Sequence, residues 1–110
     1  MSYEDGEIML CHTVKYPKAR KEHLCCECSY RIETGIRYEY FSGVWGDHEA
    51  GSFKTCRRCL GLRVIAQRNG LEPVFGELIY CMEEAGILFA ALHLTEDETE
   101  LLKLLPKELQ

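Results

Sequence analysis

Two cysteine pairs constrain this chain more than any other feature of its sequence. Cys25 and Cys28 are separated by two residues, and Cys56 and Cys59 repeat that spacing further along the chain. Two thiolates at this spacing can face one ion across a tight turn, and two such pairs complete the tetrahedral shell that structural zinc prefers. The sequence therefore predicts one structural Zn²⁺ per chain, bound by these four cysteines.

A shell of four thiolates leaves no open coordination position for water or substrate. We therefore expect the zinc to stabilise the fold and not to catalyse, and in a chain of 110 residues its binding energy would also be folding energy. The chain has seven cysteines, and an odd number cannot form a complete disulfide framework. Cys11, Cys26 and Cys81 are expected to stay outside the metal shell.

The first cysteine pair leaves an alternative open. Cys26 adjoins Cys25, and His23 lies two residues before it. We expect Cys25 to be the ligand and Cys26 to face away, because one residue between Cys26 and Cys28 is too short for the usual turn. Cys26 or His23 is the substitute ligand if Cys25 does not bind.

The segments around the two pairs predict a small α+β fold. The expected elements are a knuckle turn at 29–35, a strand at 36–41, a glycine-rich loop at 43–51 and a returning strand at 52–55. Residues 57–68 contain no proline and are followed by Asn69 and Gly70, which predicts a helix that begins at the second cysteine pair. Knuckle, hairpin and helix in this order predict a treble-clef zinc finger over about residues 23–70.

A narrower likeness rests on particular residues. They are Ala19-Arg20-Lys21-Glu22-His23, Cys25-Cys26-Glu27-Cys28, Ile32, Gly35, Tyr38, Tyr40, Ser42, Gly43, Trp45, and Phe53-Lys54-Thr55-Cys56 with Cys59. In this string the chain resembles small, mostly uncharacterised zinc-finger proteins encoded by tailed phages and prophages. The resemblance implies a phage or prophage origin and a structural metal, and it implies no particular activity.

The chain beyond residue 70 predicts further helical structure. Apolar residues at steps of three and four predict a surface helix over 75–85, ended by Gly86. Residues 87–94 form a short apolar run that suits either a strand or a buried connection. Thr95 and Glu98 predict a capping box for a last helix, with Leu101, Leu104, Leu105 and Leu109 on one stripe and Pro106 as its break.

These elements predict a single domain, 1–110, in which a treble-clef part, 1–70, is followed by an acidic helical extension, 71–110. The net charge of −5 is unevenly spread along the chain. Residues 1–69 hold 11 basic and 9 acidic residues, a charge of +2, whereas residues 70–110 hold 2 basic and 9 acidic residues, a charge of −7. The domain is therefore expected to present two surfaces of different charge.

The basic residues of the first part raise a second hypothesis, a small nucleic-acid-binding regulator. They are Lys15, Lys18, Arg20, Lys21, Arg57, Arg58, Arg63 and Arg68. At 100 degrees per residue the helix arginines form no single basic face, and the pI of about 5.4 lacks the basic character of a DNA-binding domain. Nucleic-acid binding is therefore the alternative and not the leading hypothesis.

Enzymatic activity is not expected. An HNH-type nuclease is a remote alternative, because Asp47 and His48 lie in the predicted hairpin loop. Such a nuclease needs a general base and further metal ligands, but the predicted helix offers no histidine, and Asn69 lies only at its end. The acidic start of the chain and the lack of a long apolar run predict a cytoplasmic protein without a membrane segment.

The leading hypothesis is a non-enzymatic, zinc-stabilised interaction module of phage or prophage type. It would bind and modulate a host or phage protein, for example by inhibiting a defence or nucleic-acid-processing complex. Aromatic, arginine and leucine side chains often anchor such contacts. The candidate partner-binding residues are Trp45, Tyr38, Arg57, Arg58, Leu101 and Leu105.

Overall fold

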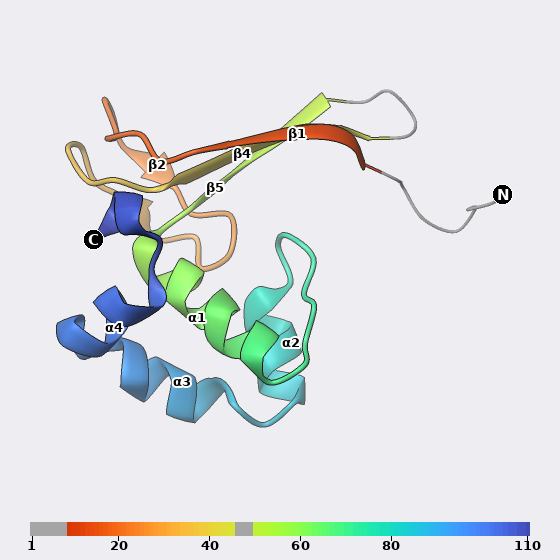
Figure 1. Ribbon diagram of the computed structural model, residues 1–110, viewed down its shortest axis with the longest axis vertical. Coiled ribbons are helices and arrows are strands. Elements are labelled where there is room, and N and C mark those ends of the chain that lie inside the picture. The colour runs from red at the N-terminus through yellow and green to blue at the C-terminus, as the bar shows by residue number, and fades with distance from the viewer. Residues whose placement is uncertain (1–8, 46–49) are drawn as a thin grey trace, which may run out of the picture.

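An antiparallel sheet covers one side of this α+β fold, and the helices pack together below it (Figure 1). The structure is a computed structural model. It describes the backbone of residues 9–45 and 50–110 and the side chains of residues 12–44 and 50–110. None of the helices in these ranges is long and apolar enough to cross a membrane.

The main sheet has three strands, β1 (Met9–Lys15), β4 (Glu39–Trp45) and β5 (Ala50–Thr55), in the order β1-β4-β5. The central strand β4 pairs antiparallel with both neighbours. A separate two-stranded hairpin joins β2 (His23–Leu24) to β3 (Arg31–Ile32). This small hairpin encloses the first cysteine pair and ends at Ile32, within the range 29–35 where the knuckle turn was expected.

The hairpin is longer than the sequence predicts. The strand expected at 36–41 begins at Glu39 and continues through Trp45, and its partner begins at Ala50. The predicted loop at 43–51 was therefore wrong at both ends, because Gly43 pairs with Gly51 inside the sheet. Interstrand hydrogen bonding outweighs the local preference of these glycines for a turn.

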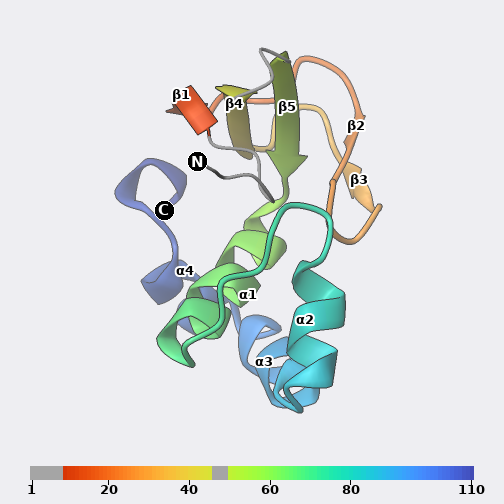
Figure 2. The ribbon, with the colours of Figure 1, turned by 90° about the vertical axis from the view of Figure 1, so that its right-hand side faces the viewer.

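The first helix, α1 (Arg57–Arg68), has the bounds that the sequence predicts. Asn69 ends it, and Gly70 follows with φ of 82°, a conformation that glycine adopts without strain. The remaining helices are α2 (Leu78–Glu84), α3 (Leu88–Thr95), α4 (Glu98–Leu104) and the short 3-10 turn η1 (Lys107–Leu109). Figure 2 shows α1 below the sheet, with α2, α3 and α4 around it.

Three sequence predictions for these helices need correction. The helix expected over 75–85 begins only at Leu78, because Phe75 instead stacks on Phe53, with 4.3 Å between ring centroids. Residues 87–94 were expected to be a strand or a buried connection, but they lie mostly in helix α3, which contacts α1, α2 and α4. This run is rich in leucine and alanine, which favour helix once tertiary packing is available.

The predicted capping box was also wrong. Thr95 is the last residue of α3, and its hydroxyl donates to the Ala91 carbonyl at 3.1 Å. Asp97 caps α4 instead, accepting a hydrogen bond from the Thr99 amide at 2.9 Å. Pro106 does end the last helical segment before η1, as predicted.

Two apolar clusters meet on α1. The larger cluster contains Cys25 and Cys59 together with residues from α1, α2 and α3, such as Leu62, Leu78 and Met82. The smaller cluster joins α1 to the C-terminal segment, and its buried members are Leu60, Leu101, Leu105 and Leu109. The predicted cysteine ligands are therefore part of the main core and not an appendage to it.

Candidate metal centre

The four predicted ligands come together at one point of the fold. The sulfur atoms of Cys25, Cys28, Cys56 and Cys59 all lie within 4.8 Å of one another. Cys25 and Cys59 are buried, Cys28 and Cys56 are half-buried, and all four are free thiols. The structure thus confirms a four-cysteine cluster that can hold a metal ion.

The spacing of the sulfurs suits a tetrahedral ion. A Zn–S bond of about 2.3 Å implies about 3.8 Å between two sulfurs of a tetrahedral site. The Sγ atoms of Cys28 and Cys56 are 3.8 Å apart. Four soft thiolates in this arrangement favour zinc over harder cations such as Ca²⁺ or Mg²⁺. The donor set therefore fits one four-coordinate zinc, whose role would be to hold the knuckle to the helix.

The knuckle positions the first two ligands. The Cys25 amide donates to the Tyr30 carbonyl at 2.9 Å, and the Ser29 amide donates to the Cys25 carbonyl at 3.0 Å. Ser29 has φ of 63°, and this left-handed residue closes the turn directly after Cys28. The amides of Glu27 and Cys56 also donate to the Cys25 sulfur, both at 3.4 Å.

The start of α1 positions the other two ligands. Cys56 is the N-cap residue, and Cys59 lies in the first turn. The first turn of α1 contains Arg57 and Arg58 and no acidic side chain. The positive end of the helix dipole therefore favours negatively charged thiolates at Cys56 and Cys59. The sequence predicted this arrangement correctly from the position of the second pair.

Hydrogen bonds within the cluster shift the thiol pKa values in opposite directions. Contacts from Cys56 and Cys59 hold the pKa of Cys25 far below its usual value. The contact with Cys25 raises the pKa of Cys56 to about 12 and also raises the pKa of Cys59. The four thiols therefore cannot all ionise side by side unless a cation lies between the sulfurs.

In the described part of the chain, the cluster includes neither Cys26 nor His23. The Cys26 sulfur lies 3.5 Å from the Thr55 hydroxyl, and burial raises the pKa of this thiol. The His23 ring faces Tyr38, with 5.4 Å between centroids. Cys81 is half-buried on α2, and the side chain of Cys11 lies outside the described residues.

Glu27 supports the centre, and the sequence analysis missed it. It lies between two ligands of the knuckle, and its side chain is 0% exposed. One carboxylate oxygen accepts from Arg63 at 3.2 Å and from the Gly76 amide at 3.1 Å, and the other accepts from the Leu78 amide at 3.0 Å. These donors lie 36, 49 and 51 residues away, so no local spacing in the sequence points to the role.

Arg63 extends this network to the sheet. Its other guanidinium nitrogen donates to Glu39 at 3.2 Å, and its guanidinium carbon lies 4.7 Å from the Phe75 ring centre. Burial raises the pKa of Glu39, and the neighbouring Arg63 lowers it only in part. One arginine therefore serves two largely buried carboxylates.

The proposed partner-binding residues are mostly not on the surface. Tyr38, Leu101 and Leu105 are 6%, 6% and 4% exposed, because the core of the chain itself takes up their apolar surface. Arg57 instead donates to Glu98 at 3.0 Å, and Arg58 donates to the Leu92 carbonyl at 3.1 Å. Both arginines thus bind α1 to the later helices.

Two other predicted sites, one for partner binding and one for a nuclease, involve residues that the structure does not fully describe. The backbone of Trp45 belongs to β4, but its side chain lies outside the described residues. Asp47 and His48, the remote nuclease candidates, also lie outside them.

An apolar groove of about 950 Å³ lies beside the ion pair of Arg63 and Glu39. It lies between the sheet and α1, because its lining comes from strands β1, β4 and β5, from α1, and from residues 73–75 and Pro106. Its apolar lining comes from Val14, Tyr16, Phe41, Phe53, Leu60, Val64, Pro73, Val74, Phe75 and Pro106. A pocket of this size and composition is typical of a binding site.

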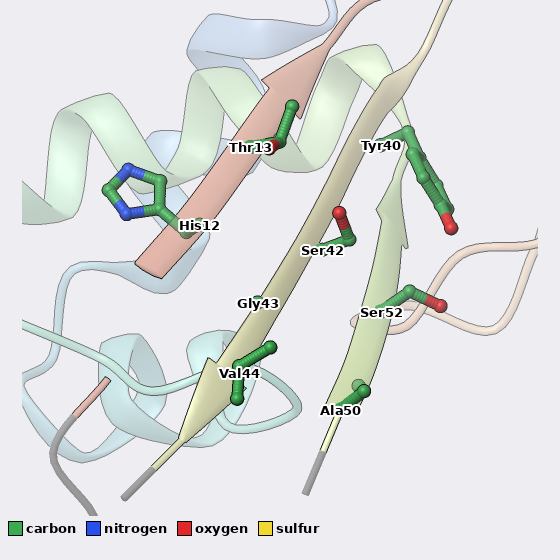
Figure 3. Close-up of a pocket in the computed structure, with 9 residues that line it drawn as sticks. His12, Thr13, Tyr40, Ser42, Gly43, Val44, Ala50 and Ser52 are labelled. Atoms are coloured by element: carbon green, nitrogen blue, oxygen red, sulfur yellow. The ribbon is translucent and has the colours of Figure 1, made fainter. Parts of the chain in front are cut away.

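The opposite face of the sheet has a smaller, shallower hollow of about 390 Å³. Figure 3 shows its small side chains, among them Thr13, Ser42 and Ser52 from the three strands, while His12 points away from them. The His12 ring stacks on Phe41, with 5.2 Å between centroids. This hollow therefore offers no cluster of catalytic or metal-binding groups among the described residues.

Comparisons with family models, with curated proteins and with solved structures find no match for this chain.

Proposed function

We propose that this chain is a non-enzymatic, zinc-stabilised interaction module built on a treble-clef zinc finger. The observation that carries the proposal is the cluster of four thiols, because a shell of four cysteines has no open position for catalysis. The order of elements supports the treble clef: the knuckle β2–β3 supplies one cysteine pair, the hairpin β4–β5 follows, and α1 begins at the second pair.

The groove beside the zinc finger supports a role in binding. Its lining is mostly apolar and aromatic, and Val74 at its rim is 62% exposed. Such a surface gains stability when a partner covers it. We infer that the zinc and the helical extension together hold this surface in shape.

The class of partner follows from the resemblance to phage and prophage zinc-finger proteins. On that basis the module binds and modulates a host or phage protein in the host cytoplasm. Inhibition of a defence complex or of a nucleic-acid-processing complex is a natural form of this role.

An affinity capture from bacterial lysate tests the proposal. The zinc-loaded protein is used as bait, the lysate is split, and one half is treated with nuclease. Recovery of the same protein partner from both halves, and its loss with a Cys59→Ser bait, supports the interaction module. The proposal is contradicted if every protein recovered with the wild-type bait is also recovered with the Cys59→Ser bait.

A nucleic-acid-binding regulator is the second candidate, favoured by one observation. Lys18, Arg20 and Lys21 are exposed and line a hollow of about 500 Å³ beside His23. Binding to mixed DNA and RNA across a range of salt concentrations tests this candidate. Phosphate contacts require a steep loss of affinity with salt, so absence of binding at low salt contradicts it.

A further inference from the structure

The groove between the sheet and α1 combines an apolar lining with a charged floor. Of its lining residues that the structure describes, Glu39 and Arg63 are the charged ones. Phe75 lies at the centre of the aromatic wall, 4.3 Å from Phe53 and 4.8 Å from Phe41 between ring centroids. A ligand in the groove would therefore contact aromatic rings and one ion pair.

The charged groups at the floor of the groove comprise two carboxylates and one guanidinium. Arg63 carries one positive charge, but it pairs with both Glu27 and Glu39. The side chain of Glu27 is fully buried and accepts hydrogen bonds from two backbone amides besides Arg63, whereas Glu39 is the carboxylate that lines the groove. Surplus negative charge therefore faces the groove from Glu39.

Two carboxylates act on the phenol of Tyr16, another residue that lines the groove. The pKa of the Tyr16 phenol is raised by burial first and then by the charges of Glu39 and Glu108. Two other basic side chains of α1 have partners elsewhere. Arg57 pairs with Glu98, and Arg58 pairs with Glu96 and donates to the Leu92 carbonyl. They do not offset the charge on Glu39 by direct contact.

We propose that the groove binds a protein segment that carries apolar side chains and one arginine or lysine, whose cation pairs with Glu39. The inference rests on the proposed interaction function and names the chemistry of the partner. Charge complementarity selects this occupant, because an apolar or acidic segment would leave Arg63 as the one cation that Glu27 and Glu39 share. Nucleic acid is disfavoured for the same reason, since its phosphates would face Glu39.

The test uses the zinc-loaded full chain and a library of random peptides displayed for selection. The enriched sequences are expected to contain apolar residues flanking an arginine or lysine. The best peptide is then synthesised, and its affinity is measured for the wild type and for variants. Changing its basic residue to glutamine is expected to weaken binding to the wild type by about tenfold or more, and to weaken binding to Glu39→Gln much less.

Two surface variants provide a matched comparison. Val74→Lys places a cation at the rim of the groove and is expected to weaken binding by about tenfold or more. Phe89→Lys adds the same charge at an 86% exposed position on α3 and is expected to leave the affinity unchanged. Because both side chains are exposed, both variants are expected to keep the wild-type fold, and NMR spectra check this.

Several outcomes would overturn the proposal. They are the absence of any enriched peptide, enriched peptides without a basic residue, and peptides whose affinity Val74→Lys does not change. Self-association that Val74→Lys abolishes would also overturn it, because the occupant would then be a second copy of this chain. A partner captured from lysate that binds Val74→Lys normally would overturn the groove assignment while leaving the interaction function intact.

Discussion

At the scale of single residues, Glu27 connects metal binding to the rest of the fold. Its position between two ligands fixes its backbone, and its buried carboxylate reaches both α1 and the start of α2. A buried carboxylate that accepts three hydrogen bonds is stable only while all the donors stay in place. Glu27 therefore holds the first turn of α2 against the turn that carries Cys25 and Cys28.

We expect Glu27→Gln to destabilise the zinc-loaded protein by about 2–4 kcal/mol, because the side-chain amide replaces one acceptor oxygen with a donor that faces the buried donors now bound by the carboxylate. Urea unfolding of the zinc-loaded protein measures the change. Glu22→Gln is the matched control: Glu22 pairs with Arg31 at 3.5 Å with both side chains more than half exposed, so we expect less than about 1 kcal/mol. Equal effects of the two substitutions would refute this role of Glu27.

Substitutions of Cys59 and Cys26 should differ in their effects on metal content and folding. Cys59→Ser removes a buried ligand, so we expect purified protein with well under about one zinc per chain and without a cooperative thermal transition. Cys26→Ser changes a neighbouring thiol outside the cluster and should retain the metal. Elemental analysis and circular dichroism measure both properties. Normal metal content in Cys59→Ser would exclude the assigned ligand set.

The ligands could be predicted from the sequence because metal chemistry imposes a short, local spacing on each pair. Glu27 could not, because its donors lie in distant segments and meet it only after folding. Tyr38, Leu101 and Leu105 show a related limit. An apolar stripe identifies residues that need to be covered, but it does not say whether the chain or a partner covers them.

At the scale of secondary structure elements, α1 organises the molecule. It begins at two metal ligands, and it contacts α2, α3 and α4. Its bounds were predictable because a cysteine pair precedes it and Asn69 and Gly70 end it. By contrast, the short apolar run of α3 suits a strand as well as a helix by its sequence pattern, and α3 forms where it packs against α1, α2 and α4.

The cap of α4 gives a prediction at this scale. We expect Asp97→Ala to destabilise the protein by about 1 kcal/mol, because the Thr99 amide loses its acceptor at the helix start. Asp97→Asn retains a side-chain oxygen at the cap and should restore most of that stability. Chemical denaturation of the zinc-loaded variants measures both. If Asp97→Ala and Asp97→Asn lower the free energy of unfolding equally, the side-chain oxygen does not stabilise α4.

At the scale of the whole molecule, the four-cysteine cluster and the helical extension share one apolar core. Cys25 and Cys59 belong to the same buried cluster as Leu78 and Met82 of α2 and Ala91 of α3. The division into residues 1–70 and 71–110 follows the charge of the sequence, but the buried contacts cross it. We therefore infer that the two parts depend on each other for stability.

Metal removal tests this dependence. Structural zinc in small fingers contributes about 10–16 kcal/mol of apparent binding energy, which is comparable to the whole stability of a typical domain. We expect a chelator to abolish the helical circular dichroism signal in one transition, together with the dispersed NMR signals of α2, α3 and α4. Addition of zinc, but not of magnesium, should restore both. Persistence of the signals from α2, α3 and α4 after complete removal of the metal would show that residues 71–110 fold independently, because the shared core would then not require the ion.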